Sequence, residues 1–286
     1  MRLMVPAALA AAAALALAAE PALRHTPAGT TASVETVMVP SGAFEFRLSG
    51  EYLEAGRPVD APKRTVTFRR GFHIMKDEVS AADYAACAAD GACEAAEGGN
   101  ASAALPVTGV SYRDATAYAA WLSAKTGETW RLPTDEEWAF AAAERRSDDA
   151  LGVSQDKANP AARWLARYRA EAGAAGKRDA EPKPLGHFGL NSNGLSDIAG
   201  NVWEWTSTCY TRATMSEGGK VASNTDNCGV RVVAGRHRGY MSIFIRDGRS
   251  GGCAAGLAPD NLGFRLVREG PSLISYMRGL WTRFAG

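Results

Sequence analysis

Five cysteines are the residues of this chain with the most chemistry to offer, and their odd number leaves at least one thiol free or paired outside the chain. Cys209 and Cys228 flank a short loop, so we predict a disulfide between them that stabilises the fold by about 3 kcal/mol. Cys87 and Cys93 lie near the end of a predicted helix and could form a second, tight bridge. Cys253 is then the remaining thiol.

The acidic residues and the histidines are weaker indications of a functional site than the cysteines. Three consecutive acids, Asp135, Glu136 and Glu137, resemble catalytic carboxylates, but acids at a helix N-terminus complement the helix dipole, and we favour this structural interpretation. The four histidines are too widely spaced to form a metal-binding motif: His25, His73, His187 and His237. The sequence contains no nucleophile elbow, phosphate loop or zinc-protease motif.

Four helices are predicted from their N-terminal signals. Ser80 and Ser111 each precede an acid by three positions, the pattern of a capping box, and Thr134 begins a third helix. A fourth helix is predicted to begin at Asn159-Pro160 and carries Trp164 beside several arginines. These arginines form either a solvated face or a binding patch for an acidic partner.

Strands are predicted mainly in the first part of the chain, where apolar residues alternate with polar ones between turn signals. The predicted strands cover residues 36–40, 42–46, 64–68 and 71–74. Residues 184–268 are rich in Gly and Asn and show few helical patterns. For this part we expect loops on a small, irregular antiparallel framework.

The N-terminus indicates export. Arg2 precedes an uncharged apolar run, and Ala16-Leu17-Ala18 has the small-x-small pattern of a cleavage site. We therefore interpret residues 1–19 as a signal peptide, with an uncleaved anchor as the alternative. No other stretch of the sequence is apolar enough to span a membrane. We expect a periplasmic or secreted protein in which disulfides can form.

Length and charge bound the architecture and exclude one class of protein. A chain of 286 residues fits one large domain or two small ones, and a formal net charge of +1 argues against a nucleic-acid binder. We predict a flexible N-terminal tail over residues 20–35, a domain over 36–269 and an amphipathic tail over 270–286. The amphipathic tail could pack on the domain, or dock on a membrane surface or a partner protein.

Several sequence blocks occur in the order found in one protein family. They are MVPSGAF (38–44), IMKDEVS (74–80), PVTGVSY (106–112), RLPTDEEW (131–138), the run ending in GNVWEW (193–205) and NLGFR (261–265). Together they resemble the formylglycine-generating enzyme, or sulfatase-modifying factor, family over nearly the whole mature chain. The resemblance implies a single compact α+β domain related to C-type lectins, with little regular secondary structure. Arg131 and Arg265 are then expected to be buried or half-buried, with loop carbonyls and carboxylates as partners.

The resemblance also implies a structural calcium ion. The matching ligands are the side chains of Asp197 and Glu204 and the carbonyls of Gly200 and Val202, an all-oxygen set that suits a hard cation. The alternative is a hydrogen-bonded loop in which Glu204 pairs with an arginine.

One departure from the family decides the chemistry. The family oxidises a substrate cysteine with copper held by two cysteines, and the aligned positions here hold Ser242 and Asp247. Cys253 lies too far along the chain to replace either. Because Cu(I) prefers thiolates, formylglycine synthesis by this route is not expected. The ergothioneine-type branch is also disfavoured, since its His-x-x-x-His-x-Glu element is missing. The chain is most similar to exported, cysteine-poor members tied to pyoverdine maturation or to copper nitrite reductase.

The resemblance places any functional site around residues 240–249, near Trp203. The candidate catalytic residues are Trp203, His237, Tyr240, Ser242, Arg246 and Asp247. His237 and Asp247 could ligate a harder metal or act as a base and its orienting group, or they only hold the loop. Four arginines could grip an anionic group or be held by internal carboxylates: Arg236, Arg238, Arg246 and Arg249.

Two functions follow as hypotheses. The first is an exported oxidoreductase or maturation enzyme that acts on a protein or peptide-like substrate, with an unidentified redox metal and without the two-cysteine mechanism. The second is a non-catalytic periplasmic binding or accessory module, for example one supporting a copper nitrite reductase system.

Overall fold

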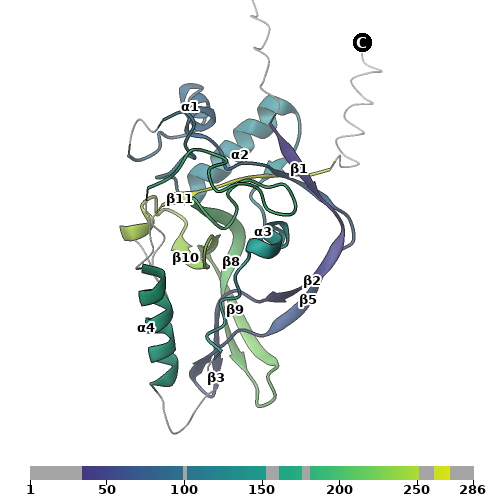
Figure 1. The fold of residues 1–286 in the computed structure, drawn as a ribbon, viewed down its shortest axis with the longest axis vertical. Coiled ribbons are helices and arrows are strands. Elements are labelled where there is room, and N and C mark those ends of the chain that lie inside the picture. The colour runs from purple at the N-terminus through teal and green to yellow at the C-terminus, as the bar shows by residue number, and fades with distance from the viewer. Residues whose placement is uncertain (1–33, 99–101, 153–160, 176–180, 251–260, 271–286) are drawn as a thin grey trace, which may run out of the picture. The chain divides into compact units, whose positions relative to one another are not determined.

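The described strands form three sheets in the computed structural model, which covers residues 34–98, 102–152, 161–175, 181–250 and 261–270 in enough detail to describe (Figure 1). All of these residues belong to one compact unit, Ser33–Gly286. The predicted signal peptide, nearly all of the predicted N-terminal tail, Cys253 and the segment from residue 271 lie outside the described residues. None of the helices that can be described is long and apolar enough to cross a bilayer.

Two of the sheets contain the strands predicted in the first part of the chain. An antiparallel four-stranded sheet has the order β1 (Thr36–Val39), β6 (Phe72–Met75), β12 (Val267–Arg268) and β7 (Trp130–Arg131). An antiparallel pair consists of β2 (Gly42–Arg47) and β5 (Lys63–Phe68). The four predicted strands are confirmed as β1, β2, β5 and β6.

The third sheet corrects the expectation for residues 184–268. Its order is β10 (Gly239–Ser242), β9 (Val221–Ala234), β8 (Trp203–Met215), β3 (Glu51–Glu54) and β4 (Arg57–Val59), and β11 (Leu262–Gly263) also pairs with β8. β8 and β9 have 13 and 14 residues and form a long hairpin, so the prediction of a small framework was wrong (Figure 1). β3 and β11 pair with β8 in parallel, not antiparallel. The first nine residues of β9 are all exposed, which removes the alternation that reveals a strand.

The helices begin where their caps predict. Ser80 caps α1 (Ala81–Ala89), and complete capping boxes begin α2 (Tyr112–Thr126) and α3 (Asp135–Ala142). α4 is described from Ala162 to Ala175, and its predicted start at 159–160 lies outside the described residues. The described residues also form two short 3₁₀ helices, η1 (Ala143–Arg145) and η2 (Gly248–Ser250).

The core lies where helices and sheets meet. Tyr84 of α1 stacks on Tyr118 of α2, and both rings pack on Phe264 in a cluster that also contains Trp205. Trp138 of α3 belongs to a second buried cluster with residues of β1 and β6. The arrangement confirms the predicted α+β class.

Candidate functional site

The predicted calcium ligands lie in a buried network of protein donors. Glu204 forms a bidentate pair with Arg265, with Nε to Oε2 at 2.7 Å and Nη2 to Oε1 at 2.9 Å. The carboxylate of Asp197 accepts from the backbone amides of Gly186 and Phe188, at 2.5 and 2.7 Å. Glu204 is thus paired with an arginine, as in the alternative considered from the sequence. Within the described part of the chain, no group of three or more His, Cys, Asp or Glu side chains is placed to hold a metal ion. The calcium site stays a prediction.

The same network contains a second carboxylate beside Arg265. Arg265 is fully buried, as expected, and Oε1 of Glu78 lies 3.7 Å from its Nη2. Neither oxygen of Glu78 has a hydrogen-bond partner. Burial raises the pKa of Glu78 to about 8, against the opposing effect of Arg265. Because these groups are buried, they affect the stability of the core and do not contact a substrate.

Trp203 and His237 are brought together by the turn between β9 and β10. The indole Nε1 of Trp203 donates to the carbonyl of His237 at 3.1 Å, and the two rings lie 5.2 Å apart. Nδ1 of His237 lies 2.9 Å from the carbonyl of Arg238. A Cβ at Gly235 would lie 2.8 Å from the Trp203 ring, so this close approach requires glycine.

A small polar pocket adjoins His237 and includes residues that the sequence did not single out as functional. It has room for about one water molecule. Its lining comes from α3, the loop after η1 and the β9–β10 turn: Asp135, Trp138, Ala139, Arg146, Ser147, Asp149, Ala234, Gly235, His237 and Arg238. Arg238 forms ion pairs with Asp135 at 3.0 Å and Asp149 at 3.1 Å. Burial raises the pKa of Asp135, and Arg238 opposes the shift.

The three acids at the start of α3 have structural partners. Asp135 pairs with Arg238, Glu136 with Arg64, and Glu137 closes the capping box while pairing with Arg131. The structural interpretation of these acids is confirmed, although their role extends beyond the helix dipole to ion pairs across the fold.

Tyr240 and Ser242 lie on β10 and do not line the pocket beside His237, although Tyr240 interacts electrostatically with the Arg238–Asp135 pair of that lining. The hydroxyl oxygen of Tyr240 accepts from the amide of Gly50 at 2.7 Å, and its ring packs on Tyr210 with centroids 5.0 Å apart. Burial raises the pKa of Tyr240. Ser242 is half-buried and pairs in the sheet with Val230.

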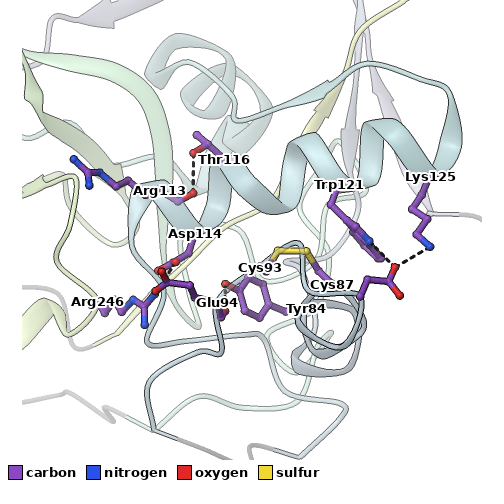
Figure 2. Close-up of a disulfide and its surroundings, with 11 residues drawn as sticks. Tyr84, Cys87, Cys93, Glu94, Arg113, Asp114, Thr116, Trp121, Lys125 and Arg246 are labelled. Carbon is purple, nitrogen blue, oxygen red and sulfur yellow. Dashed lines mark hydrogen bonds and ion pairs between the residues drawn. A yellow bond between two sulfur atoms is a disulfide. The ribbon is translucent and has the colours of Figure 1, made fainter.

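The remaining candidates are held by ion pairs. Arg246 contacts Asp114 at 2.8 Å and Glu94 at 2.6 Å (Figure 2). Asp247 accepts from Nε of Arg249 at 3.2 Å. Together with Arg238, three of the four candidate arginines therefore have internal carboxylate partners. The side chains that the sequence grouped into one site thus divide among three sets of contacts: around Trp203, around Tyr240 and around Arg246.

Four of the five cysteines form disulfides. Disulfides join Cys87 to Cys93 and Cys209 to Cys228, which confirms both predicted bridges. Of the five cysteines, Cys253 alone is left, and it lies outside the described residues.

Comparison with known proteins gives one matching family. The family described as "Sulfatase-modifying factor enzyme 1-like domain" matches residues 23–270. The formylglycine-generating enzyme of Mycobacterium tuberculosis is 41% identical over 110 residues, which cover 36% of this chain and 33% of that protein. The "Inactive C-alpha-formylglycine-generating enzyme 2" of Mus musculus is 32% identical over 167 residues, covering 56% of this chain and 48% of the relative. The chain thus matches between a third and about half of these relatives' length.

A solved structure supports the fold. PvdO from Pseudomonas aeruginosa superposes with a TM-score of 0.50 over 82% of this chain and 94% of that one, at 23% sequence identity.

Proposed function

The chain belongs to the sulfatase-modifying factor enzyme 1-like family, and from that premise we propose that it binds an exported protein or peptide-like partner without two-thiolate copper chemistry. The observation that carries the proposal is that four of its five cysteines form disulfides. One remaining thiol does not supply the two thiolates that hold Cu(I) in the family.

The residues around 237–249 also favour binding over proton transfer. His237 and Asp247 have different partners, and the arginines at 238, 246 and 249 are neutralised by carboxylates. In the same segment the apolar ring of Phe244 is 65% exposed and is accessible to another molecule. The name of the mouse relative describes it as inactive, which supports the proposal that a member of this family need not catalyse.

A copper titration of the purified mature protein tests this proposal. We expect the wild type to leave Cu(I) with a competing chelator such as bicinchoninate, and to consume no oxygen with cysteine-containing peptides. The double variant Ser242→Cys/Asp247→Cys restores the family's two thiols and should remove Cu(I) from the chelator. Retention of one Cu(I) per chain by the wild type, with oxygen uptake, would contradict the proposal.

A second candidate is an oxidative maturation enzyme with a non-thiolate metal. It is favoured by the match to the hercynine oxygenase of Mycobacterium tuberculosis, 35% identical over 106 residues that cover 36% of this chain and 22% of that protein. Elemental analysis of the same preparation separates the two. A stoichiometric redox metal that is lost in His237→Ala, with oxygen uptake, supports the second candidate; calcium alone, or no metal, removes it. Support of a copper nitrite reductase system stays a prediction.

A further inference from the structure

A disulfide fixes the segment that follows α1. Sγ of Cys87 is bonded to Sγ of Cys93, and Cys87 is fully buried while Cys93 is 9% exposed (Figure 2). The amides of Ala92 and Cys93 both donate to the carbonyl of Cys87, at 3.1 and 3.4 Å. The bridge therefore holds the start of segment 94–97 against α1.

Segment 94–97 in turn contacts Arg246. Nη2 of Arg246 donates to Oε2 of Glu94 at 2.6 Å, and Nη1 donates to the carbonyl of Ala95 at 3.3 Å. Oε1 of Glu97 lies 4.0 Å from the same Nη1. Three contacts of Arg246 thus come from residues whose position depends on the disulfide.

Arg246 joins this segment to α2 and to the chain around it. Its Nη2 lies 2.8 Å from Oδ1 of Asp114, whose side chain is 8% exposed, whereas the side chain of Glu94 is 81% exposed, so water screens the Glu94 pair far more than the Asp114 pair. The amides of Ile243 and Ile245 donate to backbone carbonyls, each at 3.0 Å, and the side chain of Ile245 packs against the main core cluster. If segment 94–97 moves away, the Asp114 pair, these backbone bonds and the packing of Ile245 are left to position residues 243–247.

We propose that the Cys87–Cys93 disulfide is a redox switch for segment 243–247, with Arg246 as the positioning residue that connects the two. A dithiol reductant breaks the Sγ–Sγ bond, places one proton on each sulfur and is itself oxidised to a disulfide. Segment 94–97 then loses its covalent link to α1 and keeps hydrogen bonds from the hydroxyl of Tyr84 to the carbonyl of Glu94 at 2.8 Å and from the amide of Glu97 to the carbonyl of Gly109 at 2.9 Å. The contacts of Arg246 with Glu94 and Ala95 are loosened as a result. Because Phe244 lies in segment 243–247, the switch changes the exposed surface on which a partner would bind.

Hydrogen–deuterium exchange of the free protein tests the connection, so the result does not depend on any partner or on the proposed function. In the variant Cys87→Ser/Cys93→Ser, amides in 243–247 should exchange about three- to fivefold faster, the factor to which losing an exposed ion pair corresponds. The matched control is Lys125→Gln, which breaks the 2.7 Å pair with Asp90 on the same two helices. The control should leave 243–247 unchanged. Equal exchange in wild type and double variant overturns the proposal.

A second measurement covers the case in which the double variant does not fold. By linkage, removing the Arg246 contacts must also make the disulfide easier to reduce. In Arg246→Gln, differential alkylation after equilibration with a dithiothreitol redox buffer should show the reduced-to-oxidised ratio of Cys87–Cys93 raised about three- to fivefold relative to that of Cys209–Cys228 in the same molecule. Arg246→Lys, which keeps the charge, should restore part of the difference. A purely structural role for Arg246 would leave the relative reduction equilibrium of the two disulfides within about twofold of wild type and would overturn the proposal.

Discussion

At the scale of single residues, Glu78 is a buried carboxylate whose two oxygens have no hydrogen-bond partner. Arg265 donates to Glu204 through Nε and Nη2, and Nη1 and Nη2 also donate to backbone carbonyls, so Glu78 is left 3.7 Å away with no hydrogen bond. Burial away from hydrogen-bond donors disfavours the ionised carboxylate, so the pKa of Glu78 is raised even though Arg265 is nearby.

This predicts an unusual dependence of stability on pH. The pKa of Glu78 is about 8 in the folded protein and 4.5 for an ordinary glutamate, so the folded state binds more protons between these values. The free energy of unfolding should therefore decrease as the pH rises from about 5 to about 8, by an amount on the order of a few kcal/mol. Asp148, whose pKa Arg47 lowers, acts in the opposite sense but only at more acidic pH.

Urea unfolding of the wild type and Glu78→Gln across this pH range is the measurement. The neutral amide should remove most of the decrease and make the variant more stable than the wild type at pH 8. The control Glu269→Gln, whose partner Arg131 is half-exposed, should follow the wild type. Parallel curves for the wild type and Glu78→Gln would exclude a protonated Glu78.

At the scale of elements, the long β8–β9 hairpin depends on close backbone approach more than on an apolar face. β3 pairs in parallel with the outer part of β8, and the chain enters β3 through Gly50, whose φ of +119° is in the region that favours glycine. A Cβ there would lie 2.2 Å from the carbonyl oxygen of Thr211 on β8. The amide of Gly50 also donates to the hydroxyl of Tyr240 on β10. One glycine thus lets three strands of the sheet meet.

Two glycine substitutions distinguish the stability cost of backbone strain from the cost of a steric clash with β8. Gly127 caps α2 with a φ of +73° and open space around it, so Gly127→Ala should cost about 1 kcal/mol from the left-handed conformation alone. Gly50→Ala adds a clash with backbone and should cost about 1–3 kcal/mol more. Thermal or urea unfolding gives both values. Similar losses at the two positions would mean that the sheet moves to accept the new methyl group.

At the scale of the whole molecule, features formed by residues close in the sequence could be predicted, and contacts between residues far apart in the sequence could not. Helix starts at Ser111 and Thr134 depend on residues three positions apart, and both disulfides close short loops, so local patterns were enough. The resemblance to a family was needed to select residues 240–249 at all. The pairing of Arg238 with Asp135 and of Arg246 with Asp114 spans more than 100 positions, and nothing in a single sequence indicates which carboxylate each arginine will meet.

If the predicted signal peptide exports the chain, it also places the two disulfides in an oxidising compartment. Disulfides form in oxidising compartments and are rare in the cytosol, so removing residues 1–19 should leave the protein in the cytosol with both bridges open. Without reduction, the exported protein should react with an alkylating reagent at one thiol, Cys253, and the retained protein at all five. Because each missing bridge costs about 2–5 kcal/mol, the retained protein should also unfold at lower urea concentration than the exported one. Intact-mass spectrometry after alkylation in denaturant counts the thiols in both preparations. Three or more reactive thiols in the exported protein would show that one of the bridges does not form in its own compartment.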